Sequence, residues 1–233
     1  MTYNNLGLIE ATTSKLISEG DWAQRLCFLV EAAIFDVLSK SNACNIMLTG
    51  GRSAEHLYKL LNNSIAFSLD LTRLNFYFGD ERCVPPCNKE SNYRLAVDTL
   101  FSGRLLSDIR IYRIEAEASD LLDVAKRYEE RLPKSIDILL LSLGGDGHIA
   151  SLFPFGPYMH EGSRSVVPAS SGGSTSDRVT ITPLVIQRAH HVFVMAIGQE
   201  KRAIYEAALL EPDNIDAIPA RLVLDRTWIF GEW

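Results

Sequence analysis

The chain has 233 residues, of which 47% are hydrophobic and 22% are charged, and its formal net charge at pH 7 is −6. These values predict one α/β domain over residues 1–233 with a large core. The acidic balance argues against general nucleic-acid binding, which needs a basic face. No stretch approaches the ~18 apolar residues of a membrane span.

The amino-terminal segment and the cysteines predict a protein of the cytoplasm. Residues 1–20 contain no apolar run long enough for a signal peptide. The four cysteines, Cys27, Cys44, Cys83 and Cys87, are few and lack paired metal spacing, which indicates reduced thiols. Cys83 and Cys87 alone supply half of a zinc site, and no second pair or nearby histidine completes it.

The first predicted elements are a helix, a strand and a second helix. Residues 21–40 carry apolar side chains at helical spacing after Asp21, a suitable N-cap. Residues 44–49 read as a short buried strand. A glycine turn, Gly50-Gly51-Arg52-Ser53, follows at once and opens the next helix. Free amides at such a helix start suit a phosphate, although a plain tight turn capped by Ser53 explains the same residues.

A second strand, residues 75–79, ends in the charged run Asp80-Glu81-Arg82 and a proline-stiffened loop. Taken alone, this run reads as a solvated turn. Residues 93–101 then form an amphipathic helix, residues 109–114 a strand, and a helix opening at residues 119–120 ends at Pro133.

The central strand is predicted at residues 136–143, an apolar run suited to a parallel sheet buried on both faces. Gly144, Gly145 and Gly147 end it, and they place Asp146 and His148 just beyond its carboxyl end. Ligands of open α/β sheets bind at this edge. The turn is therefore the leading candidate for a site.

The last third of the chain begins with an irregular stretch, in which residues 169–176 are poor in apolar side chains. Strands are predicted at residues 178–183 and 190–198, and one or two more within residues 221–230. His190 and His191 are neighbours in a strand and point to opposite faces, so a shared metal ion is disfavoured.

Four motifs resemble 6-phosphogluconolactonases of the glucosamine/galactosamine-6-phosphate isomerase superfamily. The resemblance spans residues 46–201, and the matched segments are Gly50-Gly51-Arg52-Ser53, Asp80-Glu81-Arg82-Cys83-Val84-Pro85 with Ser91-Asn92-Tyr93, residues 144–154 (Gly-Gly-Asp-Gly-His-Ile-Ala-Ser-Leu-Phe-Pro), and Arg178-Val179-Thr180-Ile181-Thr182 with Lys201. The Lys-Pro-Pro-like segment usual before the family's arginine is absent.

The resemblance implies a single-domain, mostly parallel Rossmann-like sheet flanked by helices, as in the glucosamine-6-phosphate deaminase, ribose-5-phosphate isomerase and CoA-transferase-like fold. It implies hydrolysis of 6-phospho-D-glucono-1,5-lactone to 6-phospho-D-gluconate in the oxidative pentose phosphate pathway, by a carboxylic-ester hydrolase (EC 3.1.1.31). No metal and no cofactor is implied. The expected partner is a phosphorylated sugar lactone, and the expected state is a monomer or small homo-oligomer.

The same resemblance assigns roles to residues. The phosphate would be bound by Gly50, Gly51, Arg52, Ser53, Arg178 and Lys201, and Gly145 would also bind substrate. The reacting carbon would be surrounded by His148, Asp146, Asp80 and Arg82, with His148 as the general base that activates water. Arg82 or amides of the glycine turn would stabilise the oxyanion.

Two other readings stay open. Glucosamine-6-phosphate deaminases share the Gly-x-Asp-Gly-His-Ile-Ala stretch but continue with Phe-Asn-Glu-Pro, where this chain has Ser151-Leu152-Phe153-Pro154. A non-catalytic sugar-phosphate sensor on the same scaffold would usually carry a basic DNA-binding module, which this sequence lacks. A dinucleotide-binding oxidoreductase is disfavoured because residues 144–147 lack the G-x-G-x-x-G spacing.

Overall fold

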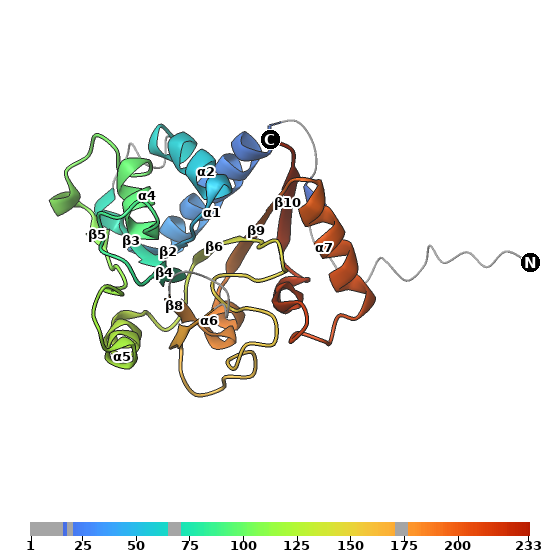
Figure 1. The fold of residues 1–233 in the computed structure, drawn as a ribbon. Coiled ribbons are helices and arrows are strands. Elements are labelled where there is room, and N and C mark those ends of the chain that lie inside the picture. Colours follow the sequence, from blue (N-terminus) through green and yellow to red (C-terminus); the bar gives the residue numbers. More distant parts are fainter. Residues whose placement is uncertain (1–15, 18–20, 65–70, 171–176) are drawn as a thin grey trace, which may run out of the picture.

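The computed structural model describes residues 16–17, 21–64, 71–170 and 177–233, and it is built on a parallel sheet of seven strands. The strands run in the order β1-β10-β9-β6-β2-β3-β5 (Figure 1). Their bounds are β1 Leu16–Ile17, β2 Cys44–Leu48, β3 Leu74–Phe78, β5 Arg110–Ile111, β6 Ile138–Ser142, β9 His191–Ile197 and β10 Thr227–Gly231. Every pairing in this sheet is parallel, as predicted.

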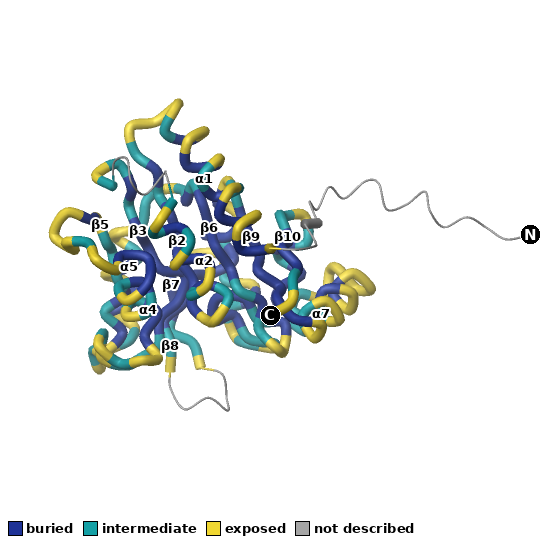
Figure 2. Tube along the Cα trace, turned by 90° about the horizontal axis from the view of Figure 1, so that it is seen from above, coloured by how far each residue is buried: buried dark blue, intermediate teal, exposed yellow. Residues whose placement is uncertain are grey.

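Alternating side chains of the strands pack into two cores, one on each face of the sheet. In β2, Ile46 and Leu48 face the first core and Met47 faces the second. The first core includes α1 (Trp22–Lys40), α2 (Arg52–Asn62), α4 (Asn92–Asp98) and α5 (Leu121–Arg131). The second includes α6 (Pro183–Arg188) and α7 (Gln199–Leu210). The burial pattern in Figure 2 shows the strands buried between these layers.

Most predicted elements are confirmed, and their local signals explain them. Asp21 caps α1 by accepting a hydrogen bond from the amide of Gln24 at 3.1 Å. Asp120 caps α5 in the same way. The strand predicted at residues 109–114 is shorter than expected, with only two residues paired. The prediction that residues 1–233 form a single domain stays a prediction.

A second, antiparallel sheet was not predicted. It has the order β4-β8-β7, with β4 Asp80–Arg82, β7 Val166–Ala169 and β8 Arg178–Ile181. The reading of Asp80–Arg82 as a solvated turn is therefore wrong, because Asp80 and Glu81 are both buried. Their carboxylates accept hydrogen bonds from buried neighbours, which compensates for their removal from water.

Two further differences concern the last third of the chain. The stretch after Pro154, which was predicted to be irregular, contains strand β7, and a helix that was not predicted, α6, follows β8 directly. Within residues 221–230, the apolar residues Leu222 and Val223 belong to a 3-10 helix, Pro219–Val223, and only one strand, β10, follows. Most of the polar stretch 169–176 lies outside the described residues.

The connections reverse direction between β2 and β6, the two strands at the centre of the sheet. From β2 the chain builds outward through β3 to β5, and from β6 it builds the other way through β9 to β10. Such a switch point leaves a crevice at the carboxyl ends of the strands, where α/β proteins bind ligands. Gly50 and Gly144 follow β2 and β6 at this position.

Tyrosine hydroxyls complete the ends of two central strands. The Tyr58 hydroxyl accepts a hydrogen bond from the Thr49 amide at 2.9 Å and donates one to the Thr49 carbonyl at 2.7 Å. Tyr128 makes the same pair of bonds with Phe78, at 2.7 and 2.9 Å. These bonds satisfy buried backbone groups where the strands diverge, so the chain can leave the sheet there.

Candidate active site

His148 and Asp146 form the centre of the candidate site at the end of β6. The Nδ1 atom of His148 lies 2.5 Å from Oδ1 of Asp146, and the same oxygen accepts the amide of His148 at 3.0 Å. The hydrogen bond from His148 lowers the pKa of Asp146 to about 2. An ionised Asp146 that accepts from Nδ1–H leaves Nε2 of His148 as the basic nitrogen.

The glycine turn makes room for this imidazole. A Cβ atom on Gly144 would lie 2.1 Å from Nδ1 of His148, so only glycine permits the ring to lie there. Gly147 adopts a φ of +88° and closes the turn. Two of the three glycines in this turn, Gly144 and Gly147, thus have a steric cause.

Two arginines lie next to each other on one face of the small sheet. Arg82 of β4 is paired in register with Arg178 of β8, which places both side chains on the same face. Burial, and then the charge of Arg82, lowers the pKa of Arg178. The Nε–H groups of both arginines are buried and have no hydrogen-bond partner within the described part of the chain. Two adjacent cations with free donors are suited to an anion.

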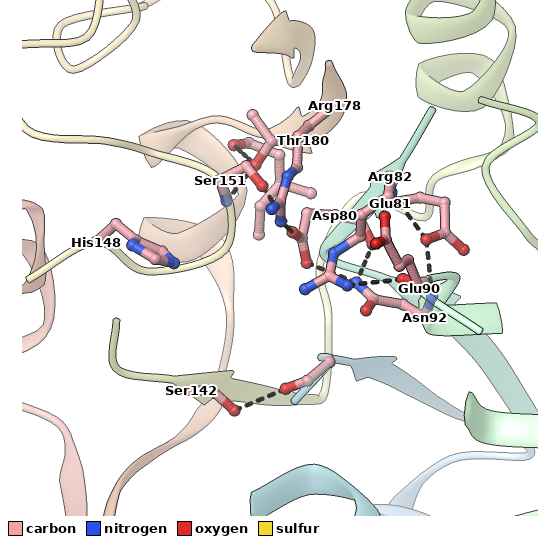
Figure 3. Close-up of polar contacts among 12 residues, drawn as sticks. Asp80, Glu81, Arg82, Glu90, Asn92, Ser142, His148, Ser151, Arg178 and Thr180 are labelled. Atoms are coloured by element: carbon pink, nitrogen blue, oxygen red, sulfur yellow. Dashed lines mark hydrogen bonds and ion pairs between the residues drawn. The ribbon is translucent and has the colours of Figure 1, made fainter. Parts of the chain in front are cut away.

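Asp80 connects Arg178 to the histidine loop. Its carboxylate lies 3.7 Å from Nη1 of Arg178 and accepts hydrogen bonds from the Ser151 hydroxyl at 2.6 Å and the Asn92 amide at 3.0 Å. The amide of Ser151 in turn donates to the Thr180 hydroxyl at 3.0 Å. Figure 3 shows this network beside His148.

The remaining predicted residues come from the starts of two helices. Gly50 accepts a hydrogen bond from the Ser142 hydroxyl at 3.0 Å, which ties β2 to β6. Gly51 and Ser53 lie at the start of α2, where no side chain caps the helix. Lys201 lies in the first turn of α7, and its Nζ would be 3.6 Å from a Cβ on Gly145.

Arg52 differs from the other predicted phosphate ligands. Its guanidinium lies 4.7 Å from the ring centroid of Trp233, near the carboxyl terminus. Trp233 packs in turn against Trp22 of α1. In this structure Arg52 therefore contacts an aromatic ring at the far end of the chain, and its role in binding phosphate stays a prediction.

Several residues of the site had no assigned role in the sequence reading. They are Ser142, Ser151, Phe153, Thr180 and, as a partner of Asp80, Asn92. Asn92 could have been found from the sequence, because Asn92 and Gly50 both belong to quoted motifs. In the structure the two are in contact, and a Cβ on Gly50 would lie 1.9 Å from the Asn92 side chain. The others carry no signal beyond the motif that contains them.

Comparison with known proteins places this chain in a family. A family model described as glucosamine-6-phosphate isomerases/6-phosphogluconolactonase matches residues 18–230. The chain belongs to this family. A 6-phosphogluconolactonase of Treponema pallidum is 29% identical over 72% of this chain and 73% of its own length. One from Pseudomonas aeruginosa is 30% identical over 84% of each chain.

Solved structures show the same fold. A 6-phosphogluconolactonase from Shewanella baltica superposes with a TM-score of 0.85, covering 97% of this chain and 100% of its own, at 23% sequence identity. The predicted fold class is therefore confirmed. In the described part of this chain, no helix is both long and apolar enough to cross a membrane, and no three metal-binding side chains cluster together.

Proposed function

We propose that this protein hydrolyses 6-phospho-D-glucono-1,5-lactone to 6-phospho-D-gluconate. The observation that carries the proposal is the close pair of His148 and Asp146 at the sheet's switch point, beside Arg82, Arg178 and Lys201. A base next to several cations fits a substrate with an electrophilic carbon at one end and a phosphate at the other. The relatives named above carry the name of this activity.

The reaction follows from the groups present. Nε2 of His148 removes a proton from water as the water oxygen bonds to C1 of the lactone. Negative charge develops on the C1 oxygen, where Arg82 or the amides of the glycine turn stabilise it. The C1–ring oxygen bond then breaks, and the imidazolium returns its proton to that oxygen. Asp146 orients the imidazole throughout the reaction and stabilises the positive charge that the ring carries between the two proton transfers.

The phosphate end is assigned to Arg178, Lys201 and the start of α2. The amides that open α2 have no intrahelical acceptor, and the helix dipole favours an anion there. Holding the phosphate fixes C1 against the base, which converts binding into a rate advantage. The cytoplasmic location and the state of monomer or small homo-oligomer stay predictions from the sequence.

The test is lactone hydrolysis by purified protein treated with chelator. His148→Ala should lower turnover by at least ~10²-fold, the low end for a general base. His190→Ala is the control, because that imidazole is exposed, lies 3.5 Å from Asp137 and precedes the amino-terminal end of β9, whereas the predicted site lies at the carboxyl ends of the strands, so turnover should be unchanged. Equal turnover of wild type and His148→Ala would contradict the role of His148 as the general base.

Glucosamine 6-phosphate serves as the second substrate in the same experiment. The family includes isomerases of this sugar, but the chain has Leu152-Phe153 where the deaminase motif has Asn-Glu. We expect no release of ammonia from glucosamine 6-phosphate. Ammonia release without lactone hydrolysis would assign the chain to the deaminase activity.

A further inference from the structure

Phe153 lies between the base and an arginine of the small sheet. Its ring centroid is 4.9 Å from that of His148, and the guanidinium carbon of Arg178 is 5.9 Å from the Phe153 ring centroid. The side chain is only partly buried, so it belongs to the wall of the site rather than to either core. One aromatic ring therefore contacts both functional groups.

The backbone that carries Phe153 is strained and held on both sides. Ala150 and Phe155 have φ angles of +50° and +56°, which are uncommon for residues other than glycine. Leu152 pairs with Ile149 in an isolated bridge, and its amide donates to the Ile149 carbonyl at 3.0 Å. Such strain persists only where surrounding contacts fix the chain, and it is concentrated at functional sites.

The contacts that fix this segment come from three different parts of the fold. Ser151 bonds to Asp80 of β4 and Thr180 of β8, and the amide of Phe155 donates to the Asp216 carbonyl at 2.7 Å. These bonds flank Phe153 on both sides in sequence. The position of its ring is thus set by two strands of the small sheet and by the loop after α7, and not by local preference.

We propose that Phe153 is a positioning residue that orients His148 and Arg178 with a single ring. The edge and face of an aromatic ring suit this double contact, because an imidazole packs against the ring and a guanidinium is attracted to its π electrons. The ring then fixes the separation between the base and the cation that holds the phosphate. This inference rests on the proposed function and deepens it, since that separation must match the length of the sugar phosphate.

Charge gives a second reason for an apolar residue here. A carboxylate at the position of Phe153 would lie between Arg178 and His148 and would pair with the guanidinium. Arg178 would then be less available to an anionic substrate. An aromatic ring holds the guanidinium in place without neutralising it.

The test compares Phe153→Leu with Phe153→Tyr, using the phosphorylated lactone and glucono-1,5-lactone, which lacks the phosphate. Leu keeps apolar volume but has no ring. With Phe153→Leu, kcat should fall roughly 10-fold for both lactones, because the base is misplaced. KM should rise roughly 3- to 10-fold for the phosphorylated lactone alone, because Arg178 loses its cation–π contact. Phe153→Tyr should stay within about threefold of wild type.

Phe155→Ala is the matched control. Phe155 lies two residues away in the same turn, its side chain is 77% exposed, and only its backbone amide takes part in fixing the segment. This variant should leave kcat and KM unchanged for both lactones. Phe153→Leu with wild-type constants, or Leu and Tyr variants with equal losses, would overturn the proposal.

A spectroscopic measurement separates this inference from the proposed function. The nearby Phe153 ring should displace the His148 ring-proton resonances, which are assigned from the signal lost in His148→Gln. Those resonances should move in Phe153→Leu and keep their wild-type positions in Phe155→Ala. If wild type hydrolyses neither lactone, the proposed function fails; if the His148 resonances are the same in Phe153→Leu, the positioning role fails.

Discussion

At the scale of single residues, the pair of Asp146 and His148 determines how the site responds to pH. Asp146 has a pKa of about 2, well below its ordinary value of 3.8, chiefly because it accepts a hydrogen bond from His148. A lowered pKa stabilises the native state above the unfolded value, and this contribution is lost as the pH falls toward 2. Asp146 is therefore ionised wherever the enzyme is expected to work, and activity lost above pH 4 on acidification must come from another group.

Asp146→Asn should lower turnover at pH 7 about 10-fold or more, because the imidazole of His148 loses its charged orienting partner. Asp146 in the wild type is ionised well above its pKa of about 2, so the loss should be present across the whole range from pH 4 to pH 8. The measurement is kcat/KM between pH 4 and pH 8.

Asp36→Asn is the control for this profile. Asp36 forms an exposed ion pair with Lys40 at 2.6 Å in α1, so it is an aspartate of the surface and not of the site. Its profile should superpose on that of wild type. Wild-type turnover in Asp146→Asn would show that Asp146 does not orient the base.

At the scale of elements, Glu81 attaches the small sheet to the first helix that follows it. Its buried carboxylate accepts hydrogen bonds from the Ser91 hydroxyl and from the amides of Asn92, Tyr93 and Arg82, at 2.7–2.9 Å. Burial raises the pKa of Glu81, and these donors act in the opposite direction. The start of α4 thus depends on a side chain of β4, and through Asn92 it also supports Asp80.

Glu81→Ala should destabilise the protein by about 2–4 kcal/mol, because several buried donors lose their acceptor at once. Glu81→Gln should cost less, since its amide oxygen still accepts. The free energy of unfolding in urea measures both. Glu55→Ala is the control, because Glu55 forms an exposed ion pair with Lys59 that is worth less than about 1 kcal/mol. Equal stability of Glu81→Ala and Glu55→Ala would contradict this role.

At the scale of the whole molecule, an acidic protein carries a group of cationic side chains in its candidate site. The chain carries a net charge of −6, while Arg82, Arg178 and Lys201 lie at one edge of the sheet. A local group of cations dominates over distant acids at short range, and the part of its attraction that passes through solvent is screened by salt. Binding of a phosphate dianion should therefore depend on salt.

KM for the phosphorylated lactone should rise severalfold between low and high ionic strength, as screening weakens its attraction to the cations. KM for glucono-1,5-lactone should stay constant. Lys201→Ala should raise KM for the phosphorylated lactone and reduce its dependence on salt, while Lys59→Ala, an exposed lysine paired with Glu55, should behave as wild type. Equal salt dependence of KM for the two lactones would place the phosphate away from these cations.

The sequence predicted those parts of the structure whose causes are local. Helix α1 follows from apolar periodicity and the cap at Asp21, and β6 follows from an unbroken apolar run. The turn at residues 144–148 follows from its glycines, of which Gly144 leaves room for the imidazole and Gly147 adopts a φ of +88°. The chemical character of the site could be read from motifs, because those residue types must recur together for the chemistry to work.

Only the tertiary structure decided how distant segments meet. No local pattern shows that Asp80–Arg82 forms a strand, because its partner, β8, lies about a hundred residues further along the chain. The same holds for the contact of Arg52 with Trp233 and for the ring of Phe153 between His148 and Arg178. Backbone propensity acts over a few neighbouring residues, whereas burial and charge pairing join residues that only the fold brings together. The sequence therefore indicated the chemistry of the site, and the tertiary structure decided the arrangement of its residues.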